Sequence, residues 1–490
     1  MTTCSRFRNA NNISRRFDVK ESKAEGHPYI PNSVKSVQES MMADIGIRNI
    51  EELYRSIPLS LRLNRLLDLP KPFSSELELK RHITTILSRN RTCEDYISFL
   101  GGGCSRHYVP AICDEINQRS EFLTAYAGEP YEDHGRFQSL FEYQSLMAEL
   151  LDLEVVNVPT YDWSQAASTV IRMAGRITGR DEILVADTIS PGRLAVIRNY
   201  CHPVMKIYFC KHDPETGLLD LSDLESKFTS RTAGIYFENP GYLGSIEIQG
   251  KSAARIAHAQ GGLCLVGVDP ISLGILEPPG GYGADIVCGD IQPLGMHMHY
   301  GGGLAGFIAT RDKKEFVMEF PSRLFGIART SVEGEYGFGD VAYDRTSFGM
   351  REAGKEFVGT HSALWGITAA VYLSLLGPKG MEKLARTILE RSLYAQNRIN
   401  EVACLRSPLF TGPHFKEFVV DFNGTGLSVS EINRRLRKRG IFGGKDLSRG
   451  FDDFSGCALY CVTEMHTKTD IDRLADALND ICSRGVDDET

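Results

Sequence analysis

Residues 263–290 read LCLVGVDPISLGILEPPGGYGADIVCGD and contain two short apolar segments, 263–269 and 285–290, that each end in an aspartate. Continuous apolar runs of this length are typical of strands that are buried on both faces of a parallel sheet. The stretch therefore predicts two strands of such a sheet, with carboxylates placed where the strands end.

The same pattern extends toward the N-terminus. Further segments alternate between strand-like and helical patterns, with strands expected at 182–187, 205–210 and 233–238 and helices at 192–200 and 251–260. Strands joined by helical crossovers predict an α/β domain in which helices cover both faces of the sheet. Because ligands bind at the carboxyl ends of such strands, Asp187, the Glu-Asn-Pro sequence at 238–240, Asp269 and Asp290 mark the expected site.

The 490 residues divide into four predicted regions. These are a disordered basic extension at 1–27, a helical segment at 28–90, a large α/β domain at 91–335, and a small α+β domain with a connecting helix at 336–490. The helical segment has helical patterns at 33–46, 49–57 and 75–90, and Ser74 is the expected N-cap of the third. The small domain is expected to contain a helix at 363–377, a strand at 416–422, a helix at 428–440, a strand at 458–464 and a last helix from 469, which places Ile471, Leu474, Leu478 and Ile481 on one face.

The composition excludes several classes of protein. The net charge is 55 − 63 = −8, and 42% hydrophobic with 24% charged residues are ordinary values for a globular chain. A mildly acidic chain argues against nucleic-acid binding, and the longest apolar stretch, 363–377, is shorter than the ~20 residues that cross a bilayer. The twelve cysteines are scattered without a Cys-x-x-Cys pair, which predicts reduced thiols, a cytoplasmic location, no disulfide framework and no zinc ribbon.

Three local motifs need a separate interpretation. GGGLAG at 301–306 matches G-x-G-x-x-G, but a strand-like segment follows it instead of a helix, so it predicts a turn and not a dinucleotide site. His297 and His299 are two apart, but no third ligand follows at a suitable spacing, so we predict no metal site. The segment TAYAGEPYEDHG at 124–135 is dense in tyrosine and acidic residues and predicts a binding loop; a solvated connection is the alternative.

Asp269 raises the question of a pyridoxal phosphate site. An aspartate at such a strand end is where pyridoxal phosphate enzymes hold the pyridine nitrogen of the cofactor, although it is also a common cap. These enzymes also need a lysine that forms an imine with the cofactor, typically at the end of a nearby strand. The next strand is followed by Gln292, whose amide forms no imine. Considered as a pyridoxal enzyme, the chain lacks its nucleophile.

This combination matches a known family. The sequence resembles the alpha-subunit (subunit 1) chains of the glycine cleavage system P-protein, the two-subunit form of glycine decarboxylase, from about residue 28 to 485. The resemblance is carried, in this order, by HPYIPNS, FLGGGCSRHYVPAICDEINQRSEFLTAY, QSLFEYQSLMAELLDLEVVN, VDPISLGILEPPGGYGADIVCGD, KEFVVDF and ALYCVTEMHTKTDIDRLADAL.

The resemblance implies a fold-type I pyridoxal-enzyme architecture, with a large sheet domain and a smaller C-terminal α+β domain. It implies that a partner, the beta subunit (subunit 2), supplies the lysine and the pyridoxal phosphate in a heterotetramer of two alpha and two beta chains. The reaction implied is decarboxylation of glycine, with transfer of the aminomethyl group to the lipoyl arm of H-protein. This chain alone is then expected to be inactive, with Gln292 where the lysine would stand.

In that family the alpha subunit borders the active site of its partner. The resemblance makes the following residues candidates for lining that site or its access path: His107, Tyr108, Thr124, Tyr126, Glu129 and Tyr131. Arg351 is the candidate for one further basic role. We expect all of these to contribute to binding, and we expect no catalytic residue in this chain.

The sequence departs from the family in three loops, at 124–135, 161–168 and 345–362. The first is shorter and more acidic than the family pattern, and the second has Trp163 and Gln165 in place of small residues. Changed loops on a kept scaffold leave open a diverged paralogue whose complex acts on another amino acid. A structural or regulatory binding protein that has kept only the fold is a further alternative.

Overall fold

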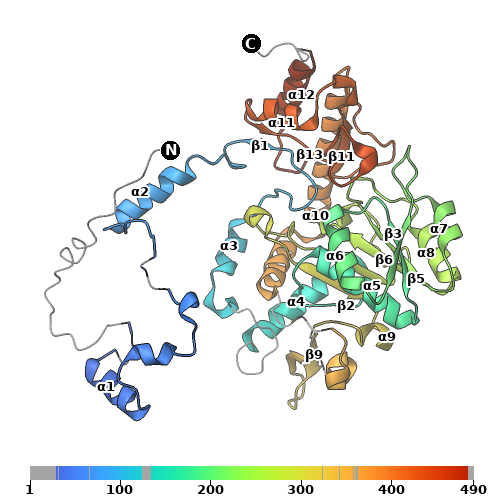
Figure 1. The fold of residues 1–490 in the computed structure, drawn as a ribbon. Coiled ribbons are helices and arrows are strands. Elements are labelled where there is room, and N and C mark those ends of the chain that lie inside the picture. The colour runs from blue at the N-terminus through green and yellow to red at the C-terminus, as the bar shows by residue number, and fades with distance from the viewer. Residues whose placement is uncertain are drawn as a thin grey trace. The chain divides into compact units, whose positions relative to one another are not determined.

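A computed structural model describes residues 29–30, 33–63, 65, 67–123, 134–322, 324–341, 343–356, 358 and 362–483 (Figure 1). The chain divides into two compact units, residues 1–89 and residues 90–490. The predicted disordered extension at 1–27 lies outside the described residues, as do Thr124, Tyr126, Glu129 and Tyr131 of the predicted binding loop.

The first unit contains helices α1 (Lys35–Asp44) and α2 (Glu76–Leu87) and two 3-10 turns, Ile50–Tyr54 and Leu59–Leu61. The helix predicted at 49–57 is thus only a short 3-10 turn. The N-cap of α2 is Ser75, whose side chain accepts a hydrogen bond from the Glu78 N–H at 3.2 Å, so the prediction of Ser74 was wrong. The Glu78 carboxylate in turn accepts the N–H of Ser74, the residue before the N-cap, at 3.2 Å.

The second unit is built on a seven-stranded sheet with the strand order β2-β8-β7-β6-β5-β3-β4. Its strands are β2 (Val155–Val156), β3 (Glu182–Ala186), β4 (Lys206–Cys210), β5 (Thr232–Glu238), β6 (Leu263–Val268), β7 (Ile286–Asp290) and β8 (Gly306–Thr310). Strands β3 to β7 are parallel, whereas β8 is antiparallel to both of its neighbours. The five strands predicted for this sheet all form, each within one residue of its expected ends.

Helices pack on both faces of this sheet, as the apolar strands require (Figure 1). The α-helices between residues 111 and 317 are α3 (Ala111–Asn117), α4 (His134–Leu151), α5 (Trp163–Thr178), α6 (Pro191–Cys201), α7 (Leu221–Lys227), α8 (Gly250–Ala259) and α9 (Lys314–Val317), of which α4, α5, α7 and α8 contact the strands. Neighbouring strand residues face opposite layers: Ile235 and Val266 belong to one buried cluster, and Tyr236 and Leu265 to the other. Cys264 and Cys288 are fully buried, as predicted.

The C-terminal part begins with the long helix α10 (Ala363–Asn400), which extends well beyond the predicted 363–377. It continues past a kink at Gly377, whose positive φ of 58° interrupts the helical backbone before Pro378. A three-stranded antiparallel sheet of β11 (Glu417–Asp421), β14 (Cys457–Cys461) and β13 (Lys445–Asp446) follows, with helices α11 (Val429–Arg437) and α12 (Lys468–Ser483). The four apolar residues predicted to share one face of α12 are all buried.

Residues 97–100 lie beside this C-terminal sheet although they are far from it in sequence. Strand β1 (Ile97–Ser98) pairs in parallel with β12 (Ile441–Phe442), and the chain then bridges Leu100 to Tyr460 of β14. This pairing fixes where the loop at 101–110 begins. A hairpin of β9 (Phe325–Arg329) and β10 (Tyr336–Asp340) was not predicted from the sequence.

The eleven cysteines among the described residues are free thiols. No helix in the described part of the chain has the length and apolar content needed to cross a bilayer.

Candidate functional site

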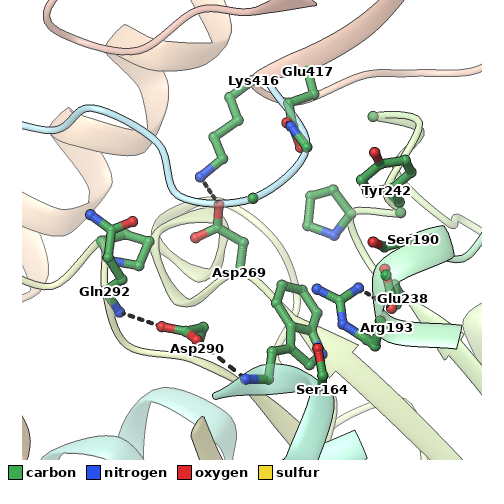
Figure 2. A pocket seen from close by; sticks show the side chains of 18 of the residues that line it. Ser164, Ser190, Arg193, Glu238, Tyr242, Asp269, Asp290, Gln292, Lys416 and Glu417 are labelled. Carbon is green, nitrogen blue, oxygen red and sulfur yellow. Dashed lines mark hydrogen bonds and ion pairs between the residues drawn. The ribbon is translucent and has the colours of Figure 1, made fainter. Parts of the chain in front are cut away.

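A cavity of about 210 Å³ lies in the second unit, at the carboxyl ends of β5, β6 and β7 (Figure 2). Its wall also includes the starts of α5 and α6, the glycine loop at 102–103 and the residues at the start of β11. The sequence predicted a site at these strand ends, and Glu238, Asp269 and Asp290 all line the cavity.

Asp269 directly follows β6, and its carboxylate is paired inside the protein. Its Oδ1 atom accepts the N–H of Ile271 at 3.0 Å, and its Oδ2 atom lies 2.6 Å from Nζ of Lys416. Figure 2 shows the Lys416 side chain extending from the start of β11 toward this carboxylate. Burial lowers the pKa of Lys416, but the nearby carboxylates, Asp269 above all, raise it to a net value above the usual one. The ammonium therefore stays charged and neutralises Asp269.

Gln292 follows β7 and is 2% exposed. Its Nε2 atom donates to the carbonyl oxygens of Ser105 and Met296 at 3.1 and 3.0 Å, and its Oε1 atom accepts the Ser105 N–H at 3.3 Å. Both ends of the amide are thus used in hydrogen bonds to the main chain. A lysine has no acceptor and would leave the Ser105 N–H without this partner.

The first turn of α5 forms another wall of the cavity, and two carboxylates accept hydrogen bonds from its N–H groups. Asp162 is the N-cap and accepts the N–H of Gln165 at 2.7 Å, and Asp290 accepts the N–H of Trp163 at 3.2 Å. Burial raises the pKa of Asp290 by more than main-chain donors, including the Gln292 N–H, lower it, so that its net value is about 7. Helix N-termini are good sites for phosphate groups because their N–H groups point at the ligand. Here the side chains of Asp290 and Asp162 already take the N–H groups of Trp163 and Gln165.

Trp163 and Arg193 occupy the floor of the cavity. The Arg193 guanidinium lies 3.9 Å from the centre of the Trp163 ring and forms an ion pair with Glu238. The indole Nε1 donates to the hydroxyl of Tyr236 at 3.1 Å. A cation on an indole face contributes about 2 kcal/mol or more when desolvated. The changed loop at 161–168 therefore shapes this chain's own cavity.

His107 and Tyr108 are held next to the cavity by Glu464. The Nδ1 atom of His107 lies 2.9 Å from Oε2 of Glu464, and the Tyr108 N–H donates to Oε1 at 2.7 Å. Burial raises the pKa of Glu464. His107 and the Tyr108 N–H lower this pKa by a larger amount, so that its net value is about 2. His107 is buried, whereas Tyr108 is 63% exposed, so the pair presents the tyrosine ring to the outside.

Arg351, the remaining candidate among the described residues, does not line this cavity. Arg351 is exposed and lies in a 3-10 segment with a positive φ of 50°. Sequence reasoning missed Lys416, Arg193 and Glu464. The only signal for Lys416 was a lysine at the very start of a predicted apolar strand.

Comparison with known proteins identifies the family. A sequence model described as the glycine cleavage system P-protein matches residues 27–478. The chain belongs to this family. A relative from Staphylothermus marinus, named "probable glycine dehydrogenase (decarboxylating) subunit 1", is 39% identical over 466 residues, which cover 93% of this chain and 98% of the relative.

Solved structures agree with this assignment. A crystal structure of the glycine decarboxylase (P-protein) of the glycine cleavage system, in inhibitor-bound form, superposes with a TM-score of 0.79 at 31% identity and covers 93% of this chain and all of that one. A sphingosine-1-phosphate lyase from Burkholderia pseudomallei reaches a TM-score of 0.60 at 16% identity, covers 88% of this chain and 96% of that one, and shows the fold alone. The architecture is the fold-type I fold of pyridoxal phosphate enzymes, as the resemblance implied.

The cavity residues do not fit the pyridoxal phosphate that this fold family implies. The cofactor needs a lysine for the imine, an acid free to pair with its ring nitrogen, and donors for its phosphate. This chain offers the Gln292 amide in place of the amine, an Asp269 already paired with Lys416, and an α5 terminus occupied by Asp162 and Asp290.

Proposed function

We propose that this chain is subunit 1 of a glycine dehydrogenase (decarboxylating), the non-catalytic alpha subunit of a two-subunit P-protein. A beta subunit carries the pyridoxal phosphate, in a heterotetramer of two alpha and two beta chains. The observation that carries the proposal is the Lys416–Asp269 pair at 2.6 Å, which removes the cofactor's counter-charge from a chain of this family. The Gln292 amide and the names of the relatives support it.

In the complex, the cofactor of the beta subunit takes up the electrons left on the substrate when CO2 leaves. The alpha chain contributes to binding and orientation at that site. Tyr108 contributes an exposed aromatic side chain. Glu464 holds this residue in place together with the buried His107. Thr124, Tyr126, Glu129 and Tyr131 are the further proposed contacts, with Arg351 as a basic group. Lipoylated H-protein is the proposed acceptor of the aminomethyl group.

The test compares the chain alone with the chain co-expressed with the beta subunit of the same source. We expect no bound pyridoxal phosphate and no CO2 release from glycine by the lone chain, and both in the purified complex with H-protein present. Bound cofactor and turnover by the lone chain would contradict the proposal.

A panel of small amino acids in the same assay tests the alternative of a diverged paralogue. The structure weakens one argument for that alternative, because Trp163 of the changed loop lines this chain's own cavity. We therefore expect glycine to be the best substrate. Release of CO2 from another amino acid in preference to glycine would favour the paralogue. Unchanged rate constants after Tyr108→Ala and His107→Gln, with assembly intact, would favour a purely structural subunit.

A further inference from the structure

Ser105 forms hydrogen bonds with two residues of the cavity. One is Gln292, which stands where a cofactor lysine is expected, and the other is Lys416, which is paired with Asp269. The N–H and the carbonyl of Ser105 both bond to the side-chain amide of Gln292, at 3.3 and 3.1 Å. Its hydroxyl accepts a hydrogen bond from Nζ of Lys416 at 2.8 Å, while the same ammonium is paired with Asp269 at 2.6 Å. All three polar groups of this serine, which is 3% exposed, are thereby fixed.

The hydrogen bonds continue from Ser105 to the exposed tyrosine. The Ser105 hydroxyl lies 3.0 Å from Nε2 of His107, and Nδ1 of His107 lies 2.9 Å from Glu464. The other carboxylate oxygen of Glu464 accepts the Tyr108 N–H at 2.7 Å. Residues 104–110 are in neither a helix nor a strand, so side-chain hydrogen bonds have to determine their conformation.

We infer that the Asp269–Lys416 pair and the Gln292 amide form a clamp on Ser105 that sets the conformation of residues 105–108. Asp269, Lys416 and Gln292 are then positioning residues for Tyr108 and not remnants of a lost site. Replacing a buried ion pair by apolar residues is often neutral or stabilising, so stability alone does not explain why this pair is kept. The effect on catalysis rests on the proposed function, in which Tyr108 borders the partner's active site.

The clamp is tested on the full chain by amide hydrogen exchange with peptides that cover 104–109. Gln292→Leu removes both hydrogen bonds to the main chain of Ser105 at similar volume. We expect the amides of Ser105 and Tyr108 to exchange at least about tenfold faster, because local opening becomes easier by more than about 1.4 kcal/mol. Ser105→Ala is a milder variant that breaks only the contacts to Lys416 and His107, and it should affect Tyr108 without affecting the amide of residue 105.

Gln144→Leu is the matched control. Gln144 is also buried and also bridges two main-chain groups, the carbonyl of Val156 and the N–H of Phe325, but it does not contact the loop. We expect this variant to speed exchange around its own partners and to leave 104–109 unchanged. Unchanged exchange at 104–109 in both Gln292→Leu and Ser105→Ala would overturn the clamp, as would an equal effect of the control.

Kinetics of the reconstituted complex separate this inference from the proposed function. With Gln292→Leu we expect kcat or KM for glycine to change several-fold relative to the control variant, at equal bound pyridoxal phosphate. Faster exchange at 104–109 with unchanged kinetics supports the clamp and contradicts a role of Tyr108 at the partner's site. Unchanged exchange contradicts the clamp whatever the kinetics show.

Discussion

The Nδ1 atom of His107 lies 2.9 Å from Oε2 of Glu464, although 357 positions separate the two residues in sequence. Glu464 lies in the loop after β14, which ends at Cys461, and His107 belongs to the loop that leaves β1. Since both side chains are largely withdrawn from water, solvent screens this contact less than it screens a contact on the surface.

Glu464→Gln should therefore destabilise the chain at neutral pH. The pKa of this carboxyl falls from a usual value of 4.5 to about 2 in the folded protein. A lowered pKa stabilises the folded state above pH 4.5, and this contribution is lost as the pH falls toward 2. The shift corresponds to about 3 kcal/mol. Urea unfolding at several pH values should show a smaller free energy of unfolding for the variant at pH 7, and curves that converge with the wild type in acid.

Glu431→Gln is the control for this acid effect. Arg434 and Arg435 likewise lower the pKa of Glu431 to about 2, but this carboxylate lies on the surface of α11. Solvent screens such a pair, so we expect a much smaller change in unfolding free energy. An equal loss of unfolding free energy in the two variants would contradict a larger contribution from the buried His107–Glu464 contact.

Lys416→Met should be the most damaging of the cavity variants. It leaves the Asp269 carboxylate buried without a counter-charge, which typically costs about 3–5 kcal/mol. The double variant with Asp269→Asn removes both charges, and we expect it to recover most of that loss. The measurement is chemical unfolding of Lys416→Met, Asp269→Asn and the double variant, compared in a double-mutant cycle.

Lys227→Met provides the matched control for the lysine change. Lys227 is paired with Asp223 at 2.7 Å within α7, and its side chain is partly exposed. This i, i+4 pair should contribute only about 0.5 kcal/mol. A coupling between Lys416 and Asp269 as small as that would contradict our account of the buried pair.

Restoring the missing lysine alone should not restore a cofactor site. In Gln292→Lys, the Lys416 ammonium is still paired with Asp269, and Asp162 and Asp290 still accept two of the N–H groups that a phosphate would need at the start of α5. We expect no imine absorbance when this variant is mixed with pyridoxal phosphate, and no mass increase after borohydride reduction. A stoichiometric adduct on the introduced lysine would show that the cavity is more permissive than its charges indicate.

The sheet could be predicted from the sequence because local patterns determine it. Apolar runs such as 263–269 and 285–290 are long enough to be strands and are separated by clear turns or helices. The hairpin at 325–340 gave no such signal, because its strands are partly exposed and interrupted by glycines. The cap of α2 was misplaced by one residue because two serines in a row satisfy the same rule, and only the Glu78 contact distinguishes them.

The site was predictable only where it depends on the end of a strand. Asp269 and Gln292 follow directly from the ends of β6 and β7, so their places were known from the sequence. Lys416 was not, because only the tertiary fold brings the residue before β11 to the end of β6, where its ammonium meets Asp269. The same holds for Glu464, whose contact with His107 joins distant parts of the chain.

Gly267→Ala should disturb the cavity from behind its floor. A Cβ atom at this buried position of β6 would lie 2.7 Å from the Tyr236 hydroxyl and 2.9 Å from the Trp163 ring. Neither neighbour has room to move, because Trp163 also contacts Arg193 and donates to Tyr236. Overpacking of this kind typically costs about 1–3 kcal/mol.

Unfolding curves and tryptophan fluorescence measure this effect, since the chain has only two tryptophans. Gly103→Ala is the control, because nothing lies within 4 Å of the Cβ that it would add. We expect the control to keep wild-type stability and emission, and Gly267→Ala to lose stability with a changed emission maximum. A Gly267→Ala protein with the stability and emission of the wild type would mean that the added methyl group fits without displacing Trp163, and it would contradict this account of the cavity floor.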